Sequence, residues 1–389
     1  MIEISKEQKA AADRASKDGD VASLAGFFRE HTGNRQLSEW YGHLGYQAHD
    51  NVEDNARSII AHTHYFDTWA GYEQFQQQLR HDPVLHQFEK ATDAIATGDT
   101  ATLESLLNRN PELIRMRSVR NHHSTLLNYV GANGFEGYRQ TTPKNAVEIA
   151  AILLNAGAEV DVWGDMYGGT STLGLVATSV HPVITGVQQE LMDILVLHGA
   201  DPNHAVAPGY TNGLLILACL HNGRYEPIRY LADKGATVDL EGAGGLGDLE
   251  KVKSYFNPSG ELINPRLQTS RDGCLIWACL LGYQDVVEFL LGTGMDVNTK
   301  WDGHTPLHSA AFGGQLAIVR LLLEKGAAME TLNSYDGTVL GATLWAWYND
   351  RKPAHREIIE VLMAAGAVIK DDWQVYIDEI RDETGSVPN

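Results

Sequence analysis

Glycines recur at fixed intervals in the second half of the chain, and this regularity constrains the fold more than any other feature of the sequence. Gly282 and Gly294 lie 12 residues apart, and the same pair recurs 32 residues later as Gly314 and Gly326. A period of about 20–50 residues is typical of repeat arrays, in which each unit buries its apolar face against its neighbours. The sequence therefore predicts a solenoid of stacked repeats.

The clearest repeat, Asp302–Glu330, indicates two short helices in each unit. A Thr-Pro dipeptide opens the first helix, because proline is tolerated in a first turn whose N–H groups have no helical partner. Leu307 is expected to face the core, and Gly314 is expected to end the helix in a left-handed conformation. The apolar stripe over 318–323 predicts the second helix. Each unit is thus a helix–turn–helix.

The TPLHSAAFGG segment of this repeat resembles the motif of the ankyrin-repeat superfamily, and variants such as TLLNYVGANG at 125–134 extend the resemblance upstream. The series runs in register from Phe88 to Lys370, which is about three quarters of the chain and about eight units. The resemblance implies an all-α ankyrin-repeat solenoid, with helix–turn–helix units joined by short β-turn fingers and a helical N-terminal cap.

Further segments are similar to a bacterial group of ankyrin proteins with an N-terminal helical segment. These are HYFDTWAGYEQFQQQL at 64–79, NAVEIAAILLNAGAEVD and YGGTSTLGLVATSVHP. This resemblance implies a fold and no particular activity. It predicts a helical cap over 1–85, the array over 86–370, and a capping helix with a tail over 371–389, because terminal repeats need polar caps.

Charge and hydropathy exclude several classes of function. The chain has 50 acidic and 30 basic residues, a formal net charge of −20, and no Lys/Arg-rich run is apparent. Such a field repels nucleic acid and anionic membranes, and it favours basic or neutral partners. No apolar stretch approaches the ~18–20 residues that span a bilayer, and the first residues lack the apolar core of a signal peptide. We predict a cytoplasmic protein that binds neither nucleic acid nor membrane.

Metal and cofactor binding are also disfavoured. His62, His64 and Asp67 have the ligand types of a zinc or iron site. Side chains two residues apart do not share a helix face, however, and the segment has the composition of a helix end. The three cysteines lie in apolar stretches, without zinc-type spacing, and are expected to pack as small hydrophobes. The sequence predicts no metal and no cofactor.

The preferred function is a binding scaffold that recognises a protein, peptide or small ligand on the concave face of the array. The ankyrin resemblance places solvent-facing positions beside the turn glycine and after the Ala-Ala pair. Here they carry aromatic, histidine and amide side chains, the composition of a recognition surface. Large apolar groups at exposed positions mark contact sites. The predicted partner-binding residues are Asn121, His122, Asn133, Tyr167, Thr178, Asn212, His221, Trp301, Asp302, His304, Phe312 and Trp345.

The alternative is an enzyme or small-molecule receptor, which we consider less favoured. Two units carry insertions between their helices, at 135–146 and 181–190. Loops tolerate insertion at little entropic cost, or the two insertions enlarge one wall of a groove within 120–204. In the second case an imidazole, a carboxylate and a phenol would suit acid–base chemistry. The candidate catalytic residues are His122, His123, Asp165, Tyr167, Arg139 and His181.

Overall fold

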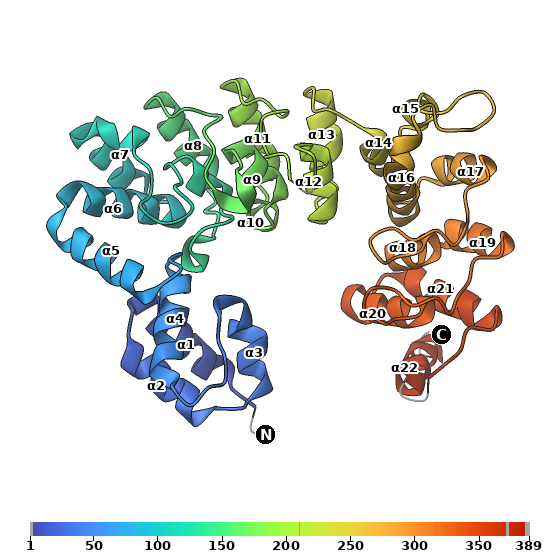
Figure 1. The fold of residues 1–389 in the computed structure, drawn as a ribbon, viewed down its shortest axis with the longest axis horizontal. Coiled ribbons are helices and arrows are strands. Elements are labelled where there is room, and N and C mark those ends of the chain that lie inside the picture. Colours follow the sequence, from blue (N-terminus) through green and yellow to red (C-terminus); the bar gives the residue numbers. More distant parts are fainter. Residues whose placement is uncertain (1–2, 210, 371–372, 386–389) are drawn as a thin grey trace. The chain divides into compact units, whose positions relative to one another are not determined.

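The structure, a computed structural model, describes residues 3–209, 211–370 and 373–385. Over these residues it is built of helices, and β structure is limited to isolated bridges. The chain divides into two compact units, 1–237 and 238–389, which are described separately (Figure 1). The end of the predicted C-terminal tail, 386–389, lies outside the described residues.

A bundle of helices forms the first part of unit 1 (blue in Figure 1). It consists of α1 (Lys6–Asp18), α2 (Val21–Glu30), α3 (Arg35–Tyr41), the 3₁₀ turn η1 (Gly42–Leu44), α4 (Val52–Thr63) and α5 (Trp69–His81). Their amphipathic faces enclose a separate apolar core that includes Leu24, Phe28, Ile59 and Phe75. The segment is helical, as the sequence predicted, and its role as a cap stays a prediction.

Four helix pairs follow in unit 1, and the first members of the last three pairs are short. The pairs are α6 (Pro83–Thr97) with α7 (Thr100–Arg109), η3 (Asn128–Gly131) with α8 (Ala146–Asn155), α9 (Thr172–Thr178) with α11 (Gln188–Leu197), and α12 (Leu215–His221) with α13 (Pro227–Asp233). The connections contain η2 (Pro111–Arg115), η4 (Gly137–Arg139), η5 (Met166–Gly168) and α10 (His181–Thr185).

The second pair opens with a single 3₁₀ turn where the sequence predicted an α-helix. The turn η3 packs against α9 at Gly131, where an added Cβ would lie 2.4 Å from the Cβ of Leu175. Ala132 then adopts a left-handed conformation with φ 49°, which ends the turn. In this repeat the first element is therefore shorter than in the other units, and its glycine lets the backbone pack closely against α9.

Unit 2 contains four further pairs and a last helix (yellow to red in Figure 1). They are α14 (Leu240–Leu246) with α15 (Leu249–Lys253), α16 (Gln268–Leu281) with α17 (Gln284–Gly292), α18 (Pro306–Gly313) with α19 (Leu316–Glu324), α20 (Val339–Asp350) with α21 (Pro353–Ala364), and α22 (Gln374–Gly385). The 3₁₀ turn η6 (Pro265–Leu267) precedes α16. The first helices, here called inner helices, contact one another in the order α14, α16, α18, α20. One apolar core runs through the whole unit.

Glycine permits a close helix contact in unit 2. An added Cβ on Gly244 of α14 would lie 2.5 Å from the carbonyl oxygen of Cys274 on α16. Real side chains never approach so closely, so only glycine allows this spacing. The glycine-rich sequence of α14 thus serves helix packing.

Side-chain hydrogen bonds link the start of a repeat's first helix to the finger of the next repeat. The histidine of the TPLH motif, His308, contacts the Thr305 hydroxyl through Nδ1 at 2.7 Å and donates from Nε2 to the carbonyl of Gly337 at 3.2 Å. Asn128 makes the equivalent hydrogen bond in unit 1, where its amide donates to the carbonyl of Val162 at 3.1 Å. Burial lowers the pKa of His308 to about 4, so this imidazole stays neutral at pH 7.

Candidate binding face and a buried charge cluster

Two aromatic rings stack on the outside of the inner helices of unit 2. Phe312 of α18 is 44% exposed and Trp345 of α20 is 61% exposed, while their helix neighbours Ala311 and Leu344 are buried. The ring centroids lie 5.9 Å apart with an interplanar angle of 16°. We call these two residues the aromatic pair. An exposed pair of large rings is unusual on a surface without a contact role.

The fingers that precede α18 and α20 present a second group of side chains. In the first finger the backbones of Trp301 and His304 form two mutual hydrogen bonds of 3.0 Å. In the second finger Tyr335 is 83% exposed, and its ring centroid lies 6.2 Å from that of His304. Asp302 and Asp336 occupy the finger tips in left-handed conformations, with φ 48° and 56°. Both are exposed and form no ion pair within the described residues.

Trp301 was predicted to be exposed, and it is instead half-buried. Its indole meets that of Trp277 edge-on at 5.7 Å. It lies over Gly273 of α16, where an added Cβ would be 3.0 Å from the indole Cε2. The absent side chain of the preceding repeat makes room for the ring. Trp301 therefore packs against its own array.

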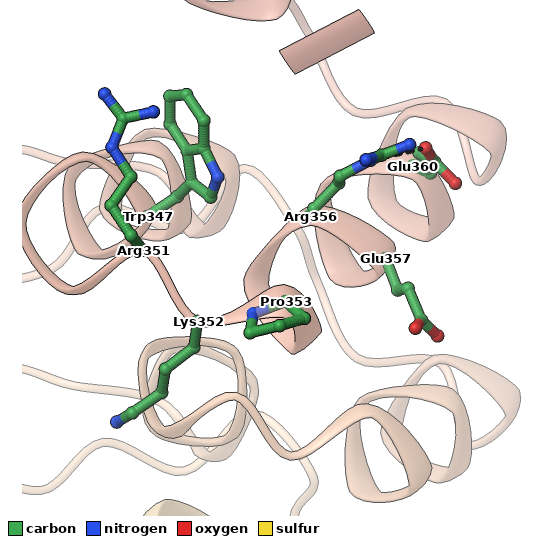
Figure 2. A pocket seen from close by; sticks show the side chains of 7 residues that line it. All are labelled: Trp347, Arg351, Lys352, Pro353, Arg356, Glu357 and Glu360. Carbon is green, nitrogen blue, oxygen red and sulfur yellow. Dashed lines mark ion pairs between the residues drawn. The ribbon is translucent and has the colours of Figure 1, made fainter. Parts of the chain in front are cut away.

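A cavity of about 350 Å³ lies where α20 turns into α21. Figure 2 shows Arg351 beside Trp347 at the end of α20, Lys352 in the turn, and Arg356 extended along α21. Three cations thus gather in a chain whose sequence shows no basic run. Pro353, the first residue of α21, lies next to Lys352.

Each of these cations already has a carboxylate partner. Arg351 pairs with Glu379 at 3.2 Å, and its guanidinium also stacks on the Trp347 ring at 4.0 Å. Lys352 Nζ lies 2.6 Å from Asp350, and Arg356 Nε lies 3.6 Å from Glu360. Because each cation is already paired, the cavity has little uncompensated positive charge that could attract an anionic ligand.

In unit 1 the most conspicuous group is a set of buried charges that we call the buried charge cluster: Glu89, Arg120, Glu136 and Arg139. The guanidinium of Arg120 lies 2.5 Å from carboxylate oxygens of both Glu89 and Glu136. Its Nε also donates to the carbonyl of His64 at 3.0 Å, and its plane lies 4.5 Å from the Phe75 ring centroid. Arg120 thereby joins the N-terminal bundle to the repeats.

Arg139 completes the cluster from within the first insertion. Its Nη1 lies 2.8 Å from Glu89 Oε2, and its Nη2 lies 2.8 Å from Asp93 Oδ1. Arg139 was a candidate catalytic residue of the alternative function, able to hold an anionic group if this loop folded inward. The loop does fold inward, but the chain's own carboxylates occupy the guanidinium. Through Arg139 the insertion therefore packs against α6.

The carboxylates and the guanidinium groups of the cluster stabilise each other's charged forms. Burial by itself raises the pKa of Glu136, but Arg120, a hydrogen bond with His122, and Arg139 outweigh it and hold that pKa well below its usual range. Burial likewise lowers the pKa of Arg120, and the facing Glu136 and Glu89 more than reverse the effect. Nearby, burial and the Arg120 charge lower the pKa of His64 to about 4.

His122 was predicted to face solvent, and it is buried at 1% exposure. The backbone N–H of Ser124 donates to its Nδ1 at 3.1 Å, so the ring proton resides on Nε2. That nitrogen points toward Glu136, 3.6 Å away. The ring packs edge-on against Tyr65 and Tyr129. The prediction of exposure assumed a position beside a turn glycine, and this turn has none. The prediction is therefore wrong for His122.

Of the other candidate catalytic residues, one pair comes together. His123 Nδ1 lies 2.7 Å from Asp165 Oδ2, and both side chains are more than half exposed. Tyr167 is 70% exposed and donates its hydroxyl to Asn133 Oδ1 at 2.8 Å. The His123–Asp165 pair is surrounded by solvent, and acid–base catalysis typically uses groups in a site from which water is excluded. The exposure of this pair therefore does not favour catalysis.

The second insertion lies beside the first, since the hydroxyl of Thr185 donates to the carbonyl of Thr142 at 3.0 Å. His181 begins α10, is half-buried, and has a pKa lowered by burial. It does not join the hydrogen bonds described for the other candidates. The remaining predicted binding residues divide into exposed Asn121 and Asn212 and half-buried Asn133, Thr178 and His221.

Sequence reasoning missed Tyr335, the most exposed aromatic side chain of the second finger. A signal was present, because Tyr-Asp-Gly at 335–337 matches Trp-Asp-Gly at 301–303 in register. It also missed Glu89 and Glu136, for which no motif exists.

Comparison with known proteins agrees with this geometry. Residues 240–333 match a family model described as ankyrin repeats in three copies. The chain is 26% identical over 215 residues to the human transient receptor potential cation channel subfamily A member 1, covering 52% of this chain and 19% of that protein. It is 35% identical over 105 residues to mouse protein phosphatase 1 regulatory subunit 12A, covering 26% and 10%. It thus spans less than a fifth of either relative.

Among solved structures, the crystal structure of the human ASB11 ankyrin repeat domain aligns with a TM-score of 0.37 and 19% identity, covering 72% of this chain and 99% of that domain. In the described residues no helix is long and apolar enough to cross a bilayer.

The stacked helix pairs with their fingers and the matched repeats at 240–333 confirm the predicted all-α ankyrin-repeat fold. This chain carries ankyrin repeats. The bacterial group, the domain boundaries and the cytoplasmic location stay predictions.

Proposed function

We propose that this protein is a binding scaffold, and that unit 2 holds a segment of a partner protein against the exposed side of α18 and α20. The observation that carries the proposal is the aromatic pair, Phe312 and Trp345, stacked and solvent-exposed on adjacent repeats. Burying two such rings supplies the kind of central apolar anchor around which protein interfaces are organised.

A binding role fits the remaining chemistry better than catalysis. Arg139 and His122, two members of the alternative catalytic set, are held by the buried charge cluster. The His123–Asp165 pair is open to solvent. The relative named protein phosphatase 1 regulatory subunit 12A shares sequence with this chain and, by its name, regulates another protein. Of the predicted binding positions in unit 1, the exposed Asn121 and Asn212 stay predictions.

The aromatic pair can be tested with a defined probe. Peptides would be selected on the chain of residues 1–389 from a random phage-displayed library, and their Kd values measured by fluorescence anisotropy. Phe312→Ala with Trp345→Ala is expected to weaken the selected peptides by roughly 30-fold or more, as hot-spot truncations do. The melting temperature should change little, because both side chains lie largely outside the core.

Leu197→Ala is the matched control, since this apolar side chain on α11 is 81% exposed and lies in unit 1. Binding should be unchanged in this variant. If no peptide is selected by the wild-type chain, or if the selected peptides bind the double variant as tightly, the proposal is wrong.

A further inference from the structure

We infer that the bound segment carries a Lys or Arg side chain about three residues from the apolar side chain that contacts the aromatic pair. This inference rests on the proposed function and adds the chemistry of the partner. It follows from what the two fingers present, and from their distance to the aromatic pair along the inner helices.

The fingers favour a cation. Asp302 and Asp336 place two exposed carboxylates at the tips, and neither has an ion-pair partner within the described residues. Between these repeats stand the rings of Tyr335 and His304, 6.2 Å apart. Carboxylates beside an exposed phenol ring are the groups that attract an ammonium or guanidinium, through charge and through the face of the ring.

The fingers also stand close together. An added Cβ on Gly303 of the first finger would lie 2.6 Å from the Cβ of Ser334 in the second. The two aspartates therefore belong to neighbouring tips of one surface. A single cationic side chain placed there would be attracted by both carboxylates.

Helix geometry sets the spacing. Phe312 follows Pro306, the first residue of α18, by six positions, and Trp345 follows Val339, the first residue of α20, by the same number. At about 1.5 Å of rise per residue, both rings lie about 9 Å along the helices from the helix starts, where the fingers end. An extended chain covers that distance in about three residues, at roughly 3.3 Å each.

The charge of the whole chain points the same way. With a formal net charge of −20, the protein attracts basic segments at long range before any contact forms. The finger aspartates would then convert this general attraction into a preference at one position of the segment. The two effects differ in how they respond to mutation, which the following experiment uses.

The test uses the selected peptides in three versions, with Arg, Ala or Glu three residues to either side of the apolar anchor. For the wild-type chain we expect binding in the order Arg, Ala, Glu, with about three- to tenfold between Arg and Ala. In Asp302→Asn with Asp336→Asn this difference should disappear, while the aromatic pair still binds all three versions. Raised salt should reduce the Arg advantage in the wild-type chain.

Glu288→Gln with Glu324→Gln is the matched control, because it removes two exposed charges from the outer helices α17 and α19. This variant should keep the Arg preference. If it loses the preference as fully as the finger variant does, the attraction is long-range only, and the inference is overturned. Binding that depends on Phe312 and Trp345 but not on the peptide's charge would overturn the inference and leave the proposed function intact.

Discussion

Glu136→Ala is expected to lower the free energy of unfolding by about 3–5 kcal/mol, the cost of removing one partner from a buried ion pair. Glu136 is fully buried, and its loss would leave Arg120 and Arg139 sharing Glu89 away from solvent. Chemical denaturation at pH 7, followed by circular dichroism, measures the change from the shift in midpoint at constant slope.

Asp93→Ala provides the comparison. Asp93 also pairs with Arg139 at 2.8 Å, but its side chain is 60% exposed. Solvent screens such a pair, so the expected loss is about 0–1 kcal/mol. If the two variants lose equal stability, the burial of the cluster does not have the energetic effect described here.

The cluster also predicts how stability changes with pH. The pKa of Glu136 is lower in the folded chain than its ordinary value of 4.5. Its stabilising contribution is therefore complete above pH 4.5, and it is lost as the pH falls toward the folded-state pKa. Glu136→Gln should be less stable than wild type at pH 7 and should lose less stability on acidification from pH 5 to 3.

Leu307→Ala should have the second large effect, about 2–5 kcal/mol of unfolding free energy, because it leaves a cavity in a fully buried site. Leu321 belongs to the apolar stripe over 318–323, from which burial would also be expected. The structure shows it half-buried at the edge of the core of unit 2, so Leu321→Ala should cost less. Thermal and chemical unfolding of both variants would measure the difference.

Leu332→Ala is the control for the second prediction, since this leucine is 46% exposed on the second finger. It should change stability by no more than about 0.5 kcal/mol. A Leu307→Ala variant as stable as this control would show that the helix register is wrong.

The repeats could be predicted from the sequence because each is specified by short-range sequence patterns. The Thr-Pro helix start, the glycine that ends α18 and the apolar stripe of α19 each act within a few residues, and the structure reproduces them. The exposure of Phe312 and Trp345 followed from the same register, because it depends only on the helix face.

The rest depends on contacts between distant segments. Glu89, Arg120 and Glu136 follow no periodicity, and charged side chains are exposed in most proteins, so sequence offers no reason to bury them. Trp301 is half-buried because Gly273, in the preceding repeat, leaves space for its ring. Such space is visible only when two repeats are placed side by side.

The buried charge cluster limits how this gene can have been rearranged. Its members and contacts come from the end of α4, from α6, from a finger and from an insertion, over 64–139. Recombination that exchanged any one of these segments would leave a buried charged side chain without its ion-pair partner. The stretch must therefore be inherited as a block. In unit 2, where a finger is joined to the preceding repeat by a bond such as that of His308 to Gly337, whole repeats can be duplicated or lost with far less damage.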